Sequence, residues 1–124
     1  MTAMVQPSCP VLVVHDDDAF RRSLIAALDQ HHFTVTSVAD GDGAVDLLTT
    51  RKFPVILIGL DLRTQKGVRT LEHLRANRED IGCAVIILGD PDPNVRTFAP
   101  WADETMLKPV DAAYVARRAR AYCT

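Results

Sequence analysis

The stretch "VILIGLDLRTQKG", residues 55–67, decides the fold. Four apolar residues are followed at once by Gly59, and Asp61 comes two residues later at the start of a loop. A short, fully apolar run that ends in this way is typical of a parallel strand with helices over both faces. Such strands carry functional side chains at their carboxyl ends, so a reactive side chain is expected where the loop begins. That position, 59, holds a glycine.

Apolar runs of the same kind recur along the chain. Residues 11–14 and 84–88 are equally clear strands, whereas residues 33–38 and 105–107 are weaker and are expected nearer the sheet edges. Amphipathic stretches lie between these runs. The alternation predicts an α/β fold, a flavodoxin-like doubly wound parallel sheet of five strands in the order 2-1-3-4-5 with helices on both faces.

The helices are marked by apolar spacing and by aspartates in capping positions. Asp18 and Asp42 are predicted to cap the first and second helices, and Asp111 precedes the last helix. Three prolines between residues 91 and 100 leave room for two turns at most after Pro93. The fourth helix is therefore predicted to be short or irregular.

Length and composition indicate one globular domain. The 124 residues are 48% hydrophobic and 24% charged, and the net charge is −2. We expect residues 1–10 to be a tail and residues 11–123 to form the domain. The near-neutral charge gives the molecule as a whole no attraction to nucleic acid. No apolar run suits a signal peptide or a membrane span, so a cytoplasmic protein is expected.

Cys9, Cys83 and Cys123 are odd in number, far apart and without metal-binding spacing. They are predicted to be reduced thiols. Trp101 leaves two alternatives open, packing under the fourth helix or anchoring a partner.

Three arginines, at positions 117, 118 and 120, lie near the end of the last helix, where cations suit the helix dipole. They form either a solvated face or a site for an anionic partner.

The strand ends carry part of the chemistry of a magnesium-dependent phosphoacceptor. Such a site needs carboxylates for the metal, a nucleophilic carboxylate, a lysine for the phosphoryl oxygens and a hydroxyl. Asp16 and Asp17 can supply metal oxygens, and Lys108 can supply the cation. The nucleophile and the hydroxyl are missing.

Five stretches together resemble the receiver domain of two-component response regulators over residues 10–123. They are "VLVVHDDDAFRRSLIAAL", "ADGDGAVDLL", "VILIGLDL", "AVIIL" and "ADETMLKPVDAAYV". The Lys-Pro pair combined with an acidic cluster closing strand one is the specific part. The resemblance implies a bacterial phosphorelay module and no enzyme.

The resemblance also shows where this sequence departs from the family. His15 stands in place of the first acid, Gly59 in place of the phosphoaccepting aspartate, and Gly89 in place of the phosphate-binding threonine or serine. Thr105 occupies the place of the aromatic switch residue. The degenerate site therefore consists of His15, Asp16, Asp17, Gly59, Gly89, Thr105 and Lys108.

Asp61 is an alternative phosphoacceptor, but it requires a two-residue slip of the alignment, which moves a side chain by about 6 to 7 Å. Since imidazole is a poor magnesium ligand, Asp16 and Asp17 are expected to bind magnesium weakly or not at all, so no cofactor is expected. Lys108 is then expected to pair with Asp16 or Asp17. His15 is either a pH-sensitive partner of these acids or a partly exposed filler.

These considerations predict a pseudo-receiver that acts by protein contact without aspartyl phosphorylation. A signalling protein or a second copy of the chain would bind through residues 91–120. Two alternatives remain, a phosphorylatable receiver using Asp61 and a small-molecule sensor using a crevice enlarged by Gly59 and Gly89. The kinase, the partner, the oligomeric state and any output domain cannot be read from the sequence.

Overall fold

The fold is a single parallel sheet between two layers of helices. The computed structural model describes residues 8–61, 65–90 and 93–123. The sheet has the predicted order, β2-β1-β3-β4-β5. Its strands are β1 (Cys9–His15), β2 (Phe33–Val38), β3 (Val55–Gly59), β4 (Ala84–Gly89) and β5 (Glu104–Leu107). The helices are α1 (Asp18–Gln30), α2 (Gly41–Thr50), α3 (Gln65–Ala76), α4 (Arg78–Ile81), α5 (Pro93–Phe98) and α6 (Ala112–Arg120).

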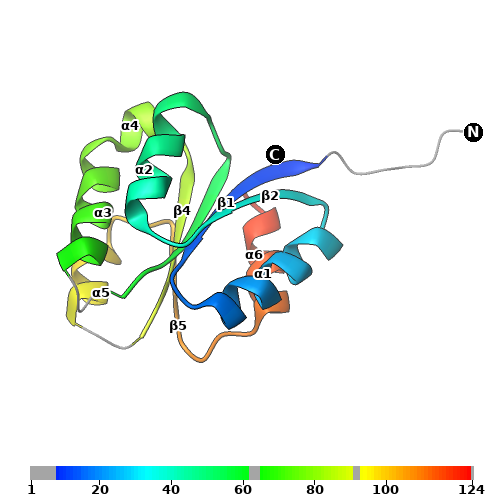
Figure 1. Ribbon diagram of the computed structural model, residues 1–124. Helices are drawn as coiled ribbons and strands as arrows, with labels where there is room; N and C mark the ends of the chain where they lie inside the picture. The colour runs from blue at the N-terminus through cyan, green and yellow to red at the C-terminus, as the bar shows by residue number, and fades with distance from the viewer. Residues whose placement is uncertain (1–7, 62–64, 91–92, 124) are drawn as a thin grey trace, which may run out of the picture.

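Helices α1 and α6 cover one face of the sheet, and α2 to α5 cover the other (Figure 1). Successive side chains of a strand point to opposite faces, so each inner strand feeds two apolar clusters. In β3, Ile56 and Ile58 pack under α2 to α5, while Val55 and Leu57 pack under α1 and α6. This double burial explains why the inner strands are apolar without alternation.

Both predicted helix caps are wrong in position. Asp17, and not Asp18, caps α1, because its Oδ1 accepts a hydrogen bond from the amide of Phe20 at 3.0 Å. Asp40, and not Asp42, caps α2 through the amide of Gly43. In both cases the chain becomes helical earlier than the apolar spacing alone indicates, so the predicted aspartate already lies in the first turn. Asp111, which was expected to precede the last helix, caps α6.

Other boundaries also differ from the sequence expectation. Strand β1 begins at Cys9, so residues 9 and 10 belong to the sheet and not to a tail; residues 1–7 lie outside the described part. The short α4 was not predicted, and it ends at Gly82, whose φ of 63° is the left-handed conformation that favours glycine. Helix α5 is short, as predicted from the prolines.

Trp101 packs into the core, which confirms the first of its two alternatives. The half-buried indole lies against the cluster under α2 to α5, and the guanidinium of Arg78 lies 5.4 Å from the ring centroid. Arg78 also donates to the backbone oxygen of Trp101 at 3.1 Å and pairs with Asp103. The segment between α5 and β5 is thus fixed to α4.

The prediction of reduced cysteines is wrong for two of the three. Cys9 and Cys123 form a disulfide, with their Cα atoms 5.9 Å apart, and Cys83 is a buried free thiol. The sequence pattern gave no sign of the pairing because the two cysteines lie 114 positions apart. They meet because α6 runs back toward the edge of the sheet where β1 begins (Figure 1).

Within the described ranges, none of the helices has the length and apolar character that crossing a membrane requires.

Candidate functional site

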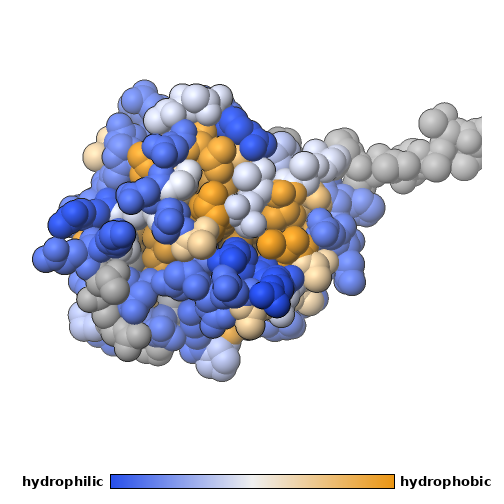
Figure 2. Space-filling view, viewed as in Figure 1, coloured by the Kyte–Doolittle hydropathy of each residue, from blue (hydrophilic) through white to orange (hydrophobic). Residues whose placement is uncertain are grey.

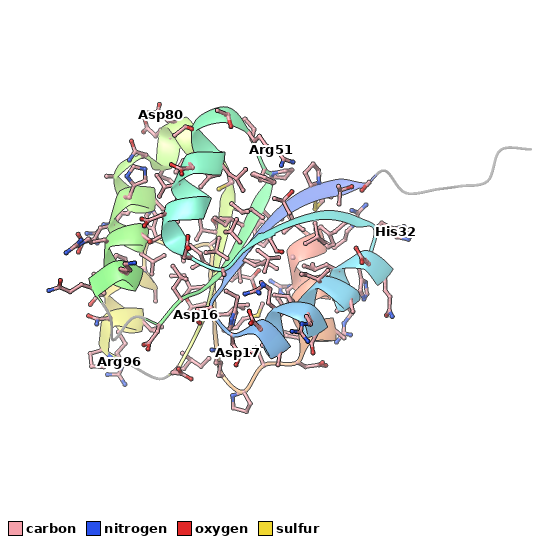
Figure 3. The ribbon with its side chains drawn as sticks, in the orientation of Figure 1. Asp16, Asp17, His32, Arg51, Asp80 and Arg96 are labelled. Carbon is pink, nitrogen blue, oxygen red and sulfur yellow. A yellow bond between two sulfur atoms is a disulfide. The ribbon has the colours of Figure 1, made fainter. Side chains whose placement is uncertain are left out.

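The carboxyl ends of β1, β3, β4 and β5 meet at one edge of the sheet, and the predicted site residues lie there. Asp16 and Asp17 follow β1 and lead into α1 (Figure 3). His15 and Gly59 are the last residues of β1 and β3 and are paired in register. Gly89 ends β4, opposite Leu107 of β5, and Lys108 follows directly. The topology thus brings His15, Gly59, Gly89 and Lys108 to the same end of the sheet, while Thr105 lies two residues before the end of β5.

His15 is fully buried, and its ring occupies the space beside Gly59. A Cβ atom added to Gly59 would lie 2.3 Å from Cδ2 of His15 and 2.6 Å from its Nε2, closer than real Cβ atoms approach other atoms. The expectation of a partly exposed histidine is therefore wrong, since the exposed fraction of His15 is 0%. The imidazole fills the volume that a side chain at position 59 would need.

The surroundings of His15 favour the neutral ring. Burial lowers its pKa, and the positive charge of Lys108 acts in the same direction against the carboxylates of Asp16 and Asp17. Its Nδ1 accepts a hydrogen bond from the amide of Asp17 at 3.1 Å. Its Nε2 is buried and has no hydrogen-bond partner in the described part of the chain. The ring is thus held in place from the Nδ1 side.

The two candidate metal ligands are engaged in backbone contacts. Asp17 caps α1, and the hydrogen bond from the Phe20 amide holds the pKa of Asp17 below its usual range. Oδ2 of Asp16 accepts a hydrogen bond from the amide of Asp61 at 3.1 Å. Asp61 itself lies two residues beyond the end of β3, in the loop. Among residues 8–61, 65–90 and 93–123, no three His, Cys, Asp or Glu side chains are grouped to hold a metal ion.

Gly89 is also matched by a neighbour that takes up its side-chain volume. A Cβ atom at position 89 would lie 2.9 Å from Cγ2 of Val95, a buried residue of α5. The predicted enlargement of the crevice at Gly59 and Gly89 is therefore absent at both points, because His15 and Val95 fill the space. Thr105 is half-buried, and its Oγ1 has no hydrogen-bond partner within the described ranges.

Lys108 does not form the predicted ion pair. The salt bridges found between described residues do not include it, so neither Asp16 nor Asp17 is neutralised by direct contact. Its backbone amide donates to the carbonyl of Gly89 at 2.8 Å, and its bond to Pro109 is cis. The positive charge of Lys108 lowers the pKa of His15 and of Asp17.

A groove between α2 and α3, which sequence reasoning missed, opens beside Asp16 and Asp61. It has a volume of about 600 Å³. Acids of α2, Asp42 and Asp46, line one side, and basic residues of α3 line the other, namely Lys66, Arg69 and His73. Their helical spacing could have indicated two facing charged ridges. Figure 2 shows hydrophilic residues over α3 and apolar surface over α2 and β2.

Comparison with known proteins assigns the family. The response regulator receiver domain model matches residues 11–120, most of the chain. This protein therefore belongs to the receiver domain family, a family of signalling modules.

Relatives and solved structures agree with this. The transcriptional regulatory protein SrrA of Staphylococcus aureus is 26% identical over 111 residues, which are 90% of this chain and 46% of that protein. The chain thus spans about half the length of these curated relatives. A Francisella response regulator receiver domain is 24% identical with a TM-score of 0.78, covering 93% of this chain and 96% of that one. The receiver domain of a Syntrophus aciditrophicus histidine kinase is 21% identical with a TM-score of 0.79, covering 94% and 90%.

Proposed function

We propose that this protein is a pseudo-receiver, which signals by protein contact and is not phosphorylated on an aspartate at the end of β3. The relationship between His15 and Gly59 carries the proposal. Position 59 has no side chain, and the buried imidazole of His15 fills the space that a phosphoaccepting side chain would occupy. An aspartate introduced at position 59 would clash with the His15 ring. The residues at positions 15 and 59 therefore both argue against phosphorylation at the end of β3.

The position of Asp61 in the loop and the hydrogen bond from its amide to Asp16 argue against Asp61 as the acceptor. Asp61 lies in the loop after β3, and its amide is bonded to the Asp16 carboxylate. A nucleophile has to be held near 3 Å from its target, opposite the group that binds the phosphoryl oxygens. Asp61 is among the residues that line the groove between α2 and α3.

The residues at this edge do not suit the magnesium ion that phosphorylation in this family requires. Magnesium prefers six oxygen ligands at short, regular distances. Here a buried imidazole replaces one acid, position 59 offers no side-chain oxygen, and Asp17 is committed to capping α1. We therefore propose a domain that works without a cofactor.

The small-molecule alternative loses its main support. It rested on space left by two glycines, and that space is taken by His15 and Val95. We retain protein contact as the function.

The face formed by α5, β5 and α6 is the surface we propose for the partner, a signalling protein or a second copy of this chain. Leu107 and Tyr114 are the exposed large hydrophobic residues of the described part, 50% and 47% exposed, and both lie on this face. Arg117 lies over the Tyr114 ring. Exposed aromatic and apolar side chains beside arginine are typical of interface centres. Residues 91 and 92 of the 91–120 range lie outside the described part.

We also propose that the protein works in the cytoplasm, as part of a two-component pathway whose kinase is unknown.

Intact mass after incubation with acetyl phosphate and magnesium tests the proposal. We expect no phosphoryl adduct on the wild type, while a phosphorylatable receiver treated in parallel gains one. An adduct that disappears in Asp61→Asn would mean that this domain is a working switch and that the pseudo-receiver proposal is wrong.

Sedimentation velocity tests the surface. We expect self-association, or binding to a partner, to be lost in Leu107→Ser and Tyr114→Ser and kept in Ala26→Ser. Ala26 is an exposed residue of α1, on a different helix. Equal behaviour of all three variants would place the contact elsewhere.

A further inference from the structure

The disulfide between Cys9 and Cys123 joins the first residue of β1 to the segment after α6. Cys9 is buried, with an exposed fraction of 5%, in the cluster under α1 and α6. Cys123 is half-buried at the surface of the same cluster. The bond therefore joins a core residue to a half-buried one at the boundary between core and solvent.

Several contacts beside this bond hold the α6 end in place. Nη1 of Arg120 donates to the backbone oxygen of His32. His32 lies in the turn before β2 and is labelled in Figure 3. The hydroxyl of Tyr122 donates to Oε2 of Glu104 at 2.7 Å, and this bond raises the pKa of Tyr122 to about 12. Arg118 pairs with the other oxygen of Glu104. The cross-link thus holds one end of a series of contacts that reaches β5.

The same contacts reach the face proposed above for the partner. Glu104 is the first residue of β5, whose last residue is the exposed Leu107. Arg118 lies one turn of α6 from Tyr114. A change at Cys123 therefore occurs close to the residues of α6 and β5 that adjoin that face.

We propose that Cys9 and Cys123 are a reversible oxidation site whose substrates are small-molecule thiols and disulfides, and that oxidation of this pair sets the order of the α6 end. The inference rests on the proposed cytoplasmic pseudo-receiver, which has lost its phosphoryl input. Disulfides in cytosolic proteins are mostly transient, catalytic or redox-sensing, and only rarely permanent. The pair gives the domain a covalent input that the β3 end no longer provides.

The chemistry is thiol–disulfide exchange with a dissolved disulfide such as oxidised glutathione. Cys123, the more exposed residue of the two, loses its proton and attacks one sulfur of the oxidant; that S–S bond breaks and one glutathione thiolate leaves. Cys9 then loses its proton and attacks the Cys123 sulfur, which expels the second glutathione thiolate. The protein gives up two electrons and two protons, and one oxidised glutathione becomes two reduced molecules.

Oxidation closes a loop between residues separated by 114 positions, which restricts the unfolded chain. It also fixes the residues after α6 on β1. We expect reduction to lower the thermal midpoint by on the order of 10 °C. Amide exchange after the end of α6 should become about tenfold faster on reduction, because a chain end without a cross-link opens locally.

The full chain is equilibrated in glutathione buffers of graded ratio, quenched, and alkylated after unfolding. Intact mass then counts the alkylated cysteines, with one expected in oxidised buffer and three in reduced buffer. Cys83→Ser is the matched control, since it removes the thiol that is free in the structure and should leave the transition unchanged. Cys9→Ser should trap glutathione on Cys123 and abolish the redox shift in thermal midpoint.

Two results would overturn the inference. One is three alkylated cysteines at every buffer ratio, which would mean that the bond does not form. The other is a bond that glutathione does not reduce in the folded protein, which would make it a permanent cross-link. Neither result depends on acetyl phosphate, so failure of this inference and failure of the pseudo-receiver proposal are read from separate measurements.

Discussion

The imidazole of His15 and the missing side chain of Gly59 are complementary: a Cβ atom at position 59 would lie 2.3 Å from the His15 ring. The ring is fully buried, so moving it aside would disturb the packing around it. The two positions therefore constrain each other, and each is expected to tolerate change only together with the other.

Gly59→Ala should lower the free energy of unfolding by about 1 to 3 kcal/mol, the usual cost of overpacking a core. In a His15→Ala background the same change should cost less, with a coupling of about 1 kcal/mol or more. Urea unfolding followed by the fluorescence of Trp101, the single tryptophan, measures all four proteins. Additivity within about 0.5 kcal/mol would show that the ring does not occupy this space.

The pH dependence of stability should report His15. Because burial lowers the pKa of His15 from 6.5 in the folded protein, the unfolded chain binds this proton at a higher pH than the folded one does. The resulting stability is fully present above about pH 6.5 and is lost as the pH falls toward the folded pKa. The urea midpoint of unfolding should therefore be lower when it is measured below about pH 6.5 than when it is measured above it.

Replacement variants separate His15 from other titrating groups. His15→Asn should reduce the loss of stability on acidification, whereas His73→Asn, at an exposed position on α3, should leave it as in the wild type. An unchanged pH dependence in His15→Asn would mean that the ring titrates alike in both states.

The sequence predicted the sheet order, and it predicted which residues follow the strand ends, because both follow from short-range patterns. Apolar runs such as residues 55–58 identify buried parallel strands, and the Lys108-Pro109 pair and the acids after β1 fix the edge where they meet. The filling of Gly59 by His15 was not predicted. It depends on the orientation of the His15 side chain of β1 toward Gly59 of β3, which no spacing in the sequence predicts.

The disulfide escaped prediction for a related reason. Cys9 and Cys123 meet only because the last helix of a doubly wound sheet returns to the edge where the first strand begins. The spacing rules for cysteines apply to local motifs and not to the two ends of a domain. Combining the predicted topology with the cysteine positions could have found the pair.

Cys83 should be unreactive in the native protein. Burial raises the pKa of its thiol to about 11, so little thiolate is present near pH 8. With an aromatic disulfide reagent, labelling of the oxidised native protein should be about 100-fold slower than labelling in denaturant, because the thiol must first be exposed by opening. Cys83→Ser should show no labelling in either condition. Rapid native labelling of the wild type would mean that the segment between α4 and β4 opens readily.

Asp103 fastens the segment between α5 and β5 to the sheet, and its replacement should separate two of its contacts. One carboxylate oxygen accepts from the Val85 amide at 2.7 Å and from Nη2 of Arg78 at 2.6 Å. Asp103→Ala leaves a buried strand amide without its acceptor and should cost about 1 to 3 kcal/mol. Asp103→Asn keeps an oxygen for Val85 and loses only the charge opposite a partly exposed arginine, so it should cost less than about 1 kcal/mol.

Urea unfolding measures both Asp103 variants, and native fluorescence gives a second reading. Arg78 lies over the Trp101 ring, so releasing it in Asp103→Ala should alter the emission of the folded protein. Equal losses of stability in Asp103→Ala and Asp103→Asn would mean that the ion pair, and not the bond to the Val85 amide, holds this segment in place.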